Sequence, residues 1–126
     1  MSNSLRGLTS QMMRNAAKSI ENRVKRVKWM NYEFSVRYSI GFSEYVKLIQ
    51  KVVADCQNDN GEIAIELIDF SLRSNIIATY ANIELPDNLD EVFRIVYASG
   101  LYELVENAVN LSQIKSIETT VRMIIG

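Results

Sequence analysis

The segment that most constrains the fold of this 126-residue chain is an alternating one at residues 31–40. Every even position holds a large apolar or aromatic side chain, and every odd position holds a polar one. A period of two, rich in aromatic and β-branched residues, is typical of a strand that buries one face. The sequence therefore predicts a strand over 31–40 that ends at Gly41. Its apolar members are Tyr32, Phe34, Val36, Tyr38 and Ile40.

This predicted strand has no clear partner within its own chain. The best candidate is 62–68, which follows the turn-forming residues 57–61, but the same residues also fit a helix over about 63–82. If that segment is helical, the strand leaves backbone N–H and C=O groups unpaired, and such an edge is a binding surface for another subunit. Both alternatives stay open from the sequence. The candidate interface residues of the strand are Tyr32, Phe34, Val36 and Tyr38.

Most of the remaining sequence has the three-to-four-residue apolar spacing of amphipathic helices. Ser43 and Asp87 are the expected N-caps of two of them, and Asn110 with Gln113 resembles a capping pair. We predict a mainly α fold with one strand or a small hairpin, built as an N-terminal helical arm and a compact body of four to five helices. The helices are expected at roughly 8–28, 43–56, 63–82, 87–99, 101–109 and from 111 onward.

Charge is distributed unevenly along the chain, although the net charge is only −1. Residues 1–30 contain seven Lys and Arg and one Glu, whereas 31–126 contain seven Lys and Arg and fourteen Asp and Glu. The pattern divides the chain into a basic arm, 1–30, and an acidic body, 31–126. A basic segment can bind an acidic protein surface, nucleic acid or an anionic membrane.

The arm is a thin amphipathic helix in this interpretation. Its apolar stripe is Leu8, Met12, Ala16, Ile20, Val24 and Val27, which are too small to bury much surface without a groove or a second helix. We favour docking on protein, either a neighbouring copy or another partner, over a merely solvated cationic face. Nucleic acid remains a possible partner, and we expect no membrane partner because interfacial helices have bulkier apolar residues. The candidate interface residues are Arg14, Lys18, Arg23, Lys25, Arg26, Lys28 and Trp29.

Catalytic chemistry has little support in the composition. The chain has no histidine, which removes the commonest general base and the zinc sites of the Cys/His type. It has no phosphate-binding glycine motif, and paired acids such as Glu62 and Glu66 are simply explained as a solvated helix face. We therefore expect no enzyme, no cofactor and no metal.

The single cysteine and the aromatic residues are expected in the core. Cys56 cannot form an intrachain disulfide, which favours the cytosol or a virion assembled there, and its expected role is that of a small buried hydrophobe. No run of about 18 apolar residues occurs, so no membrane span is predicted. Core packing is the first interpretation of the following aromatics, and a cluster facing a partner is the alternative: Phe70, Tyr80, Phe93, Tyr97 and Tyr102.

The C-terminal half resembles small proteins encoded by phages and prophages of Gram-positive bacteria. The resemblance lies in Asp69-Phe70, in the segment 80–86 and in Val96-Tyr97. In those proteins "YTN-x-x-LP" precedes an acidic helix that ends in "VY", and here Ala81 replaces the Thr. The resemblance covers about 65–126 and the strand at 31–40, but not the arm. It implies phage origin and assigns no catalytic or binding residue.

These observations together predict a phage structural or assembly protein in the virion or the host cytoplasm. It is expected to act through protein–protein contacts, as a homo-oligomer or by docking to other virion proteins. One alternative is a phage-encoded inhibitor of a host defence nuclease. Another is a nucleic-acid-binding accessory protein, whose affinity should fall steeply with salt.

Overall fold

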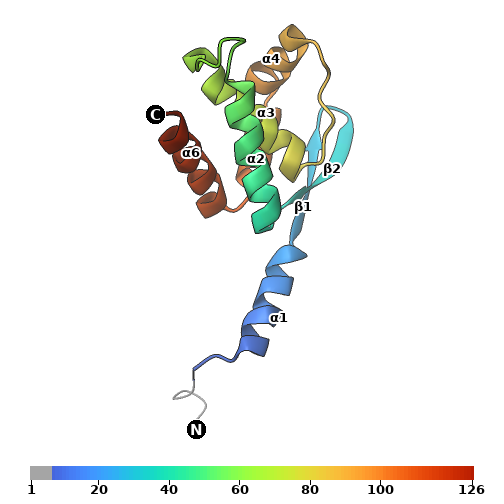
Figure 1. The fold of residues 1–126 in the computed structure, drawn as a ribbon. Coiled ribbons are helices and arrows are strands. Elements are labelled where there is room, and N and C mark those ends of the chain that lie inside the picture. The colour runs from blue at the N-terminus through green and yellow to red at the C-terminus, as the bar shows by residue number, and fades with distance from the viewer. Residues whose placement is uncertain (1–6) are drawn as a thin grey trace.

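The structure, a computed structural model, describes residues 7–126 and is mainly helical with one two-stranded antiparallel hairpin (Figure 1). The mainly α fold is therefore confirmed, while Arg6 and the rest of 1–6 lie outside the described residues. Helices α2–α6 gather around one core, and α1 extends away from them (Figure 1). In chain order the elements are α1 (Ser10–Glu21), β1 (Val24–Trp29), β2 (Tyr32–Arg37), α2 (Phe42–Asp55), the 3-10 helix η2 (Ile65–Leu67), α3 (Ile68–Tyr80), α4 (Leu89–Ala98), α5 (Leu101–Ala108) and α6 (Leu111–Ile125).

Helix α3 lies at the centre of the core, in contact with α2, α4 and α5. The side chains of Ile76, Ile77 and Tyr80 are completely buried. Because these and other buried residues are spread around α3, the helix is covered on several sides and has no wide solvent face. Helix α6 closes the core against α2 and α5, with Ile117 and Val121 fully buried.

The hairpin corrects two predictions at once. The strand predicted over 31–40 is confirmed for Tyr32–Arg37, which form β2, whereas Tyr38 and the two residues after it lie outside the strand. Its partner is β1, in the same chain and immediately before it. The helix predicted over 8–28 is therefore wrong beyond Glu21, because 24–29 form a strand. Val27 lies opposite Phe34 in the antiparallel register, and the boundary drawn at residue 30 falls in the hairpin turn.

Two predicted boundaries also differ from the structure. Residues 62–68 form no strand in the described chain beyond an isolated bridge between Gln57 and Ile63, and they lead through η2 into α3. The helical alternative for 63–82 is thus confirmed for most of its length. Helix α2 begins at Phe42, so Ser43 lies inside its first turn and does not cap it.

The starts of α4 and α6 are set by asparagine side chains. Asn110 Oδ1 accepts the backbone N–H of Gln113 at 3.0 Å, which confirms the predicted capping pair. Helix α4 starts one residue later than predicted, because Asn88 and not Asp87 accepts the N–H of Glu91, at 3.0 Å. Both residue types are good caps, so the sequence alone did not separate the neighbours.

The side chain of Gln113 connects α6 to the end of the hairpin and to α3. Its Oε1 accepts the backbone N–H of Ile40 at 3.0 Å and the hydroxyl of Tyr80 at 2.7 Å. Its Nε2 donates to the carbonyl of Ile40 at 3.1 Å. One amide thus satisfies three polar groups of Ile40 and Tyr80, two residues whose side chains are otherwise buried in the core.

Replacing Gln113 with Ala should lower the free energy of unfolding by about 2–4 kcal/mol, because those three groups lose their partner in a partly dry site. Urea denaturation measures the change, with Gln50→Ala, an exposed residue of α2, as the control. A Gln113→Ala variant as stable as the control would show that water replaces the amide without cost.

Candidate protein-docking surfaces

Helix α1 presents an apolar face that is mostly uncovered within the described chain, and only Ala17 and Ile20, near its C-terminal end, border the body. None of its residues is buried. Thr9 caps it by accepting the N–H of Met12 at 3.2 Å, and its large apolar side chains Met12, Met13 and Ile20 are 54%, 54% and 44% exposed. They lie with Ala16 and Ala17 on one side of the helix, at spacings of three and four. An exposed amphipathic helix is a candidate surface for docking onto protein.

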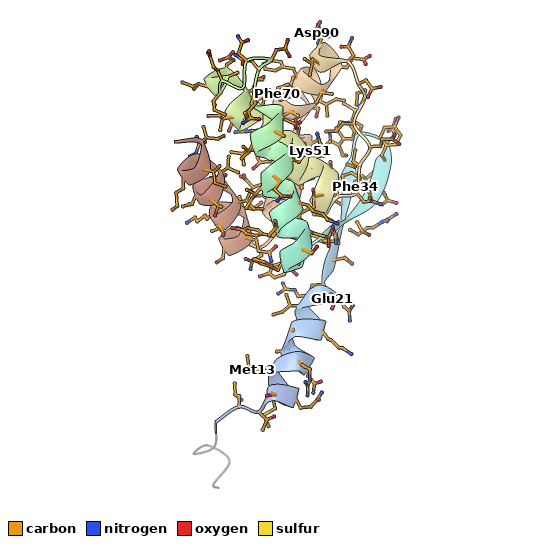
Figure 2. All side chains as sticks on the ribbon, in the orientation of Figure 1. Met13, Glu21, Phe34, Lys51, Phe70 and Asp90 are labelled. Atoms are coloured by element: carbon orange, nitrogen blue, oxygen red, sulfur yellow. The ribbon has the colours of Figure 1, made fainter. Side chains whose placement is uncertain are left out.

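The base of α1 is held by contacts within the hairpin. The carbonyl of Arg23 accepts the N–H of Tyr38 at 3.0 Å, and the Arg23 guanidinium lies 3.7 Å from the centre of the Tyr38 ring. The Tyr38 hydroxyl in turn accepts the side-chain N–H of Asn110 at 2.8 Å. These contacts tie the residue after α1 to α6, and Figure 2 shows Glu21 next to the body and Met13 far from it.

A second contact ties the hairpin to α2 and α3. Arg37 donates to both carboxylate oxygens of Glu44, at 2.9 and 2.7 Å, and to the carbonyl of Thr79 at 2.8 Å. The hydrogen bond from Arg37 lowers the pKa of Glu44 below its ordinary value. The end of β2 is therefore held by a bidentate ion pair between Arg37 and Glu44.

The predicted cations of the arm lie on two different elements. Arg14 and Lys18 are exposed on α1, whereas the other exposed cations, Lys25, Arg26 and Lys28, are on β1 and share no helical stripe with them. Within residues 7–126 none of these five cations forms an ion pair. Arg26 makes a long contact of 3.4 Å to Ser35 Oγ. The positive charge of α1 and β1 is thus free to meet a partner.

Most of the predicted strand interface is used inside the chain. Val36 is completely buried, Phe34 packs against the core, and Trp29 Nε1 donates to the carbonyl of Ser99 at 3.0 Å. A partner could reach Val36 only if the hairpin left the body. Tyr32, at 64% exposed, is the one strong candidate that remains in the strand set, and Figure 2 shows Phe34 on the hairpin beside the helices.

A groove that the sequence did not indicate lies on the body. It has a volume of about 510 Å³ and runs between α2, α3 and the segment 85–92. Its apolar wall includes Phe70, Leu85 and Val92, and its polar end includes Lys51 and Asp55. These residues are far apart in the sequence, so only the packing of α2, α3 and α4 brings them together.

An exposed apolar stripe on α4 extends this groove. Leu89, Phe93 and Tyr97 are 68%, 54% and 39% exposed and recur every four residues. Leu89 lines the groove itself, and the Phe93 ring meets the Phe70 ring edge-on with 5.7 Å between centres. Of the five aromatics predicted for the core, Tyr80 and Tyr102 are confirmed there, and Phe70 is partly buried against it. Phe93 and Tyr97 are exposed, so their core assignment is wrong, and the alternative that they face a partner stays a prediction.

An ion-pair cluster holds this stripe against α3. The Tyr97 hydroxyl donates to Asp69, whose carboxylate lies 2.9 Å from Arg73 Nε. Arg73 also pairs with Glu103 at 3.4 Å and lies 4.6 Å from the centre of the Tyr102 ring. Burial, together with the hydrogen bond to Asp69, raises the pKa of Tyr97 to about 12. The Tyr97 hydroxyl stays protonated at neutral pH and donates its hydrogen bond to Asp69.

The charged residues that line the groove carry a net negative charge. Residues 55–91, which supply most of its wall, contain nine Asp and Glu and one cation, Arg73. Of these acids only Asp55 and Asp87 line the groove, together with Lys51, which pairs with Asp55 at 2.9 Å. The groove thus combines an apolar floor with one acid, Asp87, that forms no ion pair within residues 7–126, the opposite charge to α1 and β1.

Other kinds of site have no support in the geometry. Cys56 is completely buried, as predicted, and burial raises the pKa of its thiol, so it is a core residue rather than a reactive one. In residues 7–126, no group of three or more His, Cys, Asp or Glu side chains is arranged to hold a metal ion.

Among the helices of residues 7–126, none has the length and hydrophobicity needed to cross a bilayer. Comparisons of the chain with protein-family models, with curated proteins and with solved structures found no match.

The Arg37–Glu44 pair should make part of the stability pH-dependent. Because the pKa of Glu44 is lower in the folded chain than its ordinary 4.5, its stabilisation is present above pH 4.5 and is lost as pH falls through the folded value. Glu44→Gln should therefore cost about 0.5 kcal/mol at neutral pH and nothing in acid.

Urea denaturation at several pH values measures this difference, with Glu62→Gln, an exposed acid without an ion pair among the described residues, as the control. A deficit for Glu44→Gln that is equal at neutral and acid pH would mean that the loss comes from packing and not from charge.

Proposed function

We propose that this chain is an assembly protein whose copies associate through α1, an arm that docks on the acidic body of another copy. The observation that supports this most directly is the exposed apolar face of α1, none of whose residues is buried. Each large apolar side chain that moves from water into an interface contributes about 1.5–3 kcal/mol when fully buried. The free energy gained by burying Met12, Met13 and Ile20 offsets part of the entropy cost of association.

Charge indicates which surface the arm docks on. Residues 7–28 contain six Lys and Arg and one Glu, whereas 55–91 contain nine Asp and Glu and one Arg. Two arms therefore repel each other, while an arm and a body attract. Contacts of this kind weaken as salt screens the charges, and their apolar part remains.

The biological setting rests on the sequence resemblance alone. On that basis we propose that the assembly is a structural or assembly component of a phage, in which the chain contacts its own copies or other virion proteins. The exposed arm supports either partner, because both require an apolar helix face that is free before docking.

A nucleic-acid-binding accessory protein is the second candidate, favoured by the exposed cations of α1 and β1 that lack ion pairs within the described residues. Such a protein binds DNA or RNA with an affinity that falls steeply as the salt concentration rises. Band-shift assays at low salt separate the two, because an assembly protein without this role shifts no nucleic acid.

Removing the apolar face of α1 should abolish self-association. The double variant Met13→Glu/Ile20→Glu is expected to weaken the association at least tenfold, as measured by sedimentation and light scattering at low salt. The body should remain equally stable in urea, because neither side chain is buried.

The matched control is Gln11→Glu/Asn15→Glu, which adds the same charge to the polar side of α1, where these two residues bond to each other at 2.9 Å. The proposal predicts that the control self-associates much more strongly than the apolar-face variant. Wild-type chain that is monomeric at every concentration, or equal association of both variants, would contradict it.

A further inference from the structure

We infer that the acceptor of α1 is the apolar groove between α2, α3 and the segment 85–92 of a second copy of this chain. This inference rests on the proposed function, because it names the surface to which the arm binds. It adds the binding site on the acceptor copy and the direction of the contact, from the arm of one copy to the groove of the next. Because each copy has one arm and one groove, each copy can make two such contacts.

The groove has the chemistry that an amphipathic helix requires. Its volume of about 510 Å³ is in the range of pockets that enclose several side chains. The wall is apolar and partly exposed, and the α4 stripe widens it at one edge. Its apolar lining includes Leu67, Phe70, Ala78, Leu85, Leu89 and Val92.

Helix α1 has the complementary shape and spacing. Its 12 residues span about 18 Å. Met13, Ala17 and Ile20 recur at i, i+4 and i+7, the spacing by which helices anchor in grooves. Alanines beside the larger side chains let the helix backbone approach the groove wall, and methionine adapts to irregular pockets.

The charges match in sign. Arg14 and Lys18 lie on the polar side of α1, where Arg14 donates to Gln11 Oε1 at 3.1 Å, and Asp87 lines the groove just before α4. Asp90 and Glu91 follow in the first turn of α4. Lys51 at the other end of the groove is neutralised by Asp55 and so opposes the arm little.

The contact must form between different copies. Figure 2 shows Lys51, Phe70 and Asp90 in the half of the body that lies away from α1, and Met13 beyond the opposite end. Arg23, two residues after α1, is held by its contacts with Tyr38, and α1 runs away from the body, so its Met13 end does not reach the groove of its own copy (Figure 2). A contact between two different surfaces is heterologous, and it closes into a ring or continues as a filament.

Pairing of two α1 helices is the main alternative, and charge opposes it. Such a pair would bring ten exposed cations together, five from the α1 and β1 of each copy. It would also leave the α4 stripe and the groove uncovered. Docking in the groove covers both apolar surfaces and pairs opposite charges.

The chain offers an unusually close control for a groove variant. Leu89 and Leu111 are both the first residue of a helix, both follow an asparagine cap, and they are 68% and 61% exposed. Leu89 lines the groove, whereas Leu111 does not. Leu89→Lys removes an apolar contact and adds a charge that repels the arm, and Leu111→Lys makes the same change elsewhere.

We expect Leu89→Lys to weaken self-association at least tenfold by sedimentation and Leu111→Lys to leave it unchanged. If Leu89→Lys associates like wild type while Met13→Glu/Ile20→Glu is monomeric, the groove is not the acceptor and the proposed function stands. If both variants associate like wild type, both the groove and the arm proposals fail.

Mixing the two defective chains tests the direction of the contact. Met13→Glu/Ile20→Glu retains an intact groove, and Leu89→Lys retains an intact arm. An equimolar mixture should therefore form a dimer with one copy of each, seen by native mass spectrometry, although each variant alone is monomeric. A mixture that stays monomeric would overturn the inference. So would self-association of Leu89→Lys alone through its intact arms.

Discussion

The pairing of β1 with β2 is the interaction on which the rest of the structure depends. It ends α1 at Glu21, and it places Val27 and Val36 against α5 and the core. A two-stranded hairpin is marginal alone, so it needs this packing, together with the bond from Trp29 to Ser99, to persist. Because the hairpin is fixed, α1 points away from the body, and the body leaves most of the apolar face of α1 uncovered.

The helices were predictable because their apolar residues recur at a helical period over long segments. The core was predictable for the same reason, and Cys56, Tyr80 and Tyr102 lie where the pattern placed them. Strand β2 was also visible, since no helix accommodates strict alternation of aromatic and polar residues over ten positions.

Strand β1 was not predictable, because Val24 and Val27 recur at helical spacing and lie on opposite faces of the strand, one exposed and the other buried. The turn gave only a weak signal. In the two-residue turn Met30–Asn31, Met30 adopts a left-handed φ of 54° at the position where glycine is usual, and Asn31 is the only typical turn residue. The consequence was a helix drawn through residues that pair with β2, and a strand left without a partner.

The groove could not be derived from the sequence for a different reason. Its walls come from α2, α3 and 85–92. The periodicity of apolar residues within each segment does not predict the distance at which the three segments pack. The α4 stripe was visible as Leu89, Phe93 and Tyr97, yet spacing alone does not tell a buried face from an exposed one. Tertiary packing decides that, and here it leaves the stripe in solvent beside the groove.

The uneven charge has two physical origins. Several acids of the body serve local structure, such as Asp90 and Glu91 in the first turn of α4 and Asp69 in its pair with Arg73. Among the cations of α1 and β1, Lys18 lies in the last turn of α1, where the helix dipole favours positive charge, whereas Lys25, Arg26 and Lys28 form no ion pair within the described residues. The exposed cations and apolar face of α1 are complementary to the apolar lining of the groove and to Asp87, and this complementarity is the basis of the proposed contact between copies.

Hydrogen exchange of α1 as a function of protein concentration tests this account most directly. A 12-residue helix with no buried residue is marginal in isolation, so its amides should exchange fast in dilute chain. The account predicts that their protection rises with concentration, as arms dock, while α3 stays equally protected throughout. Protection of α1 that is the same at every concentration would contradict the central claim that another copy covers this helix.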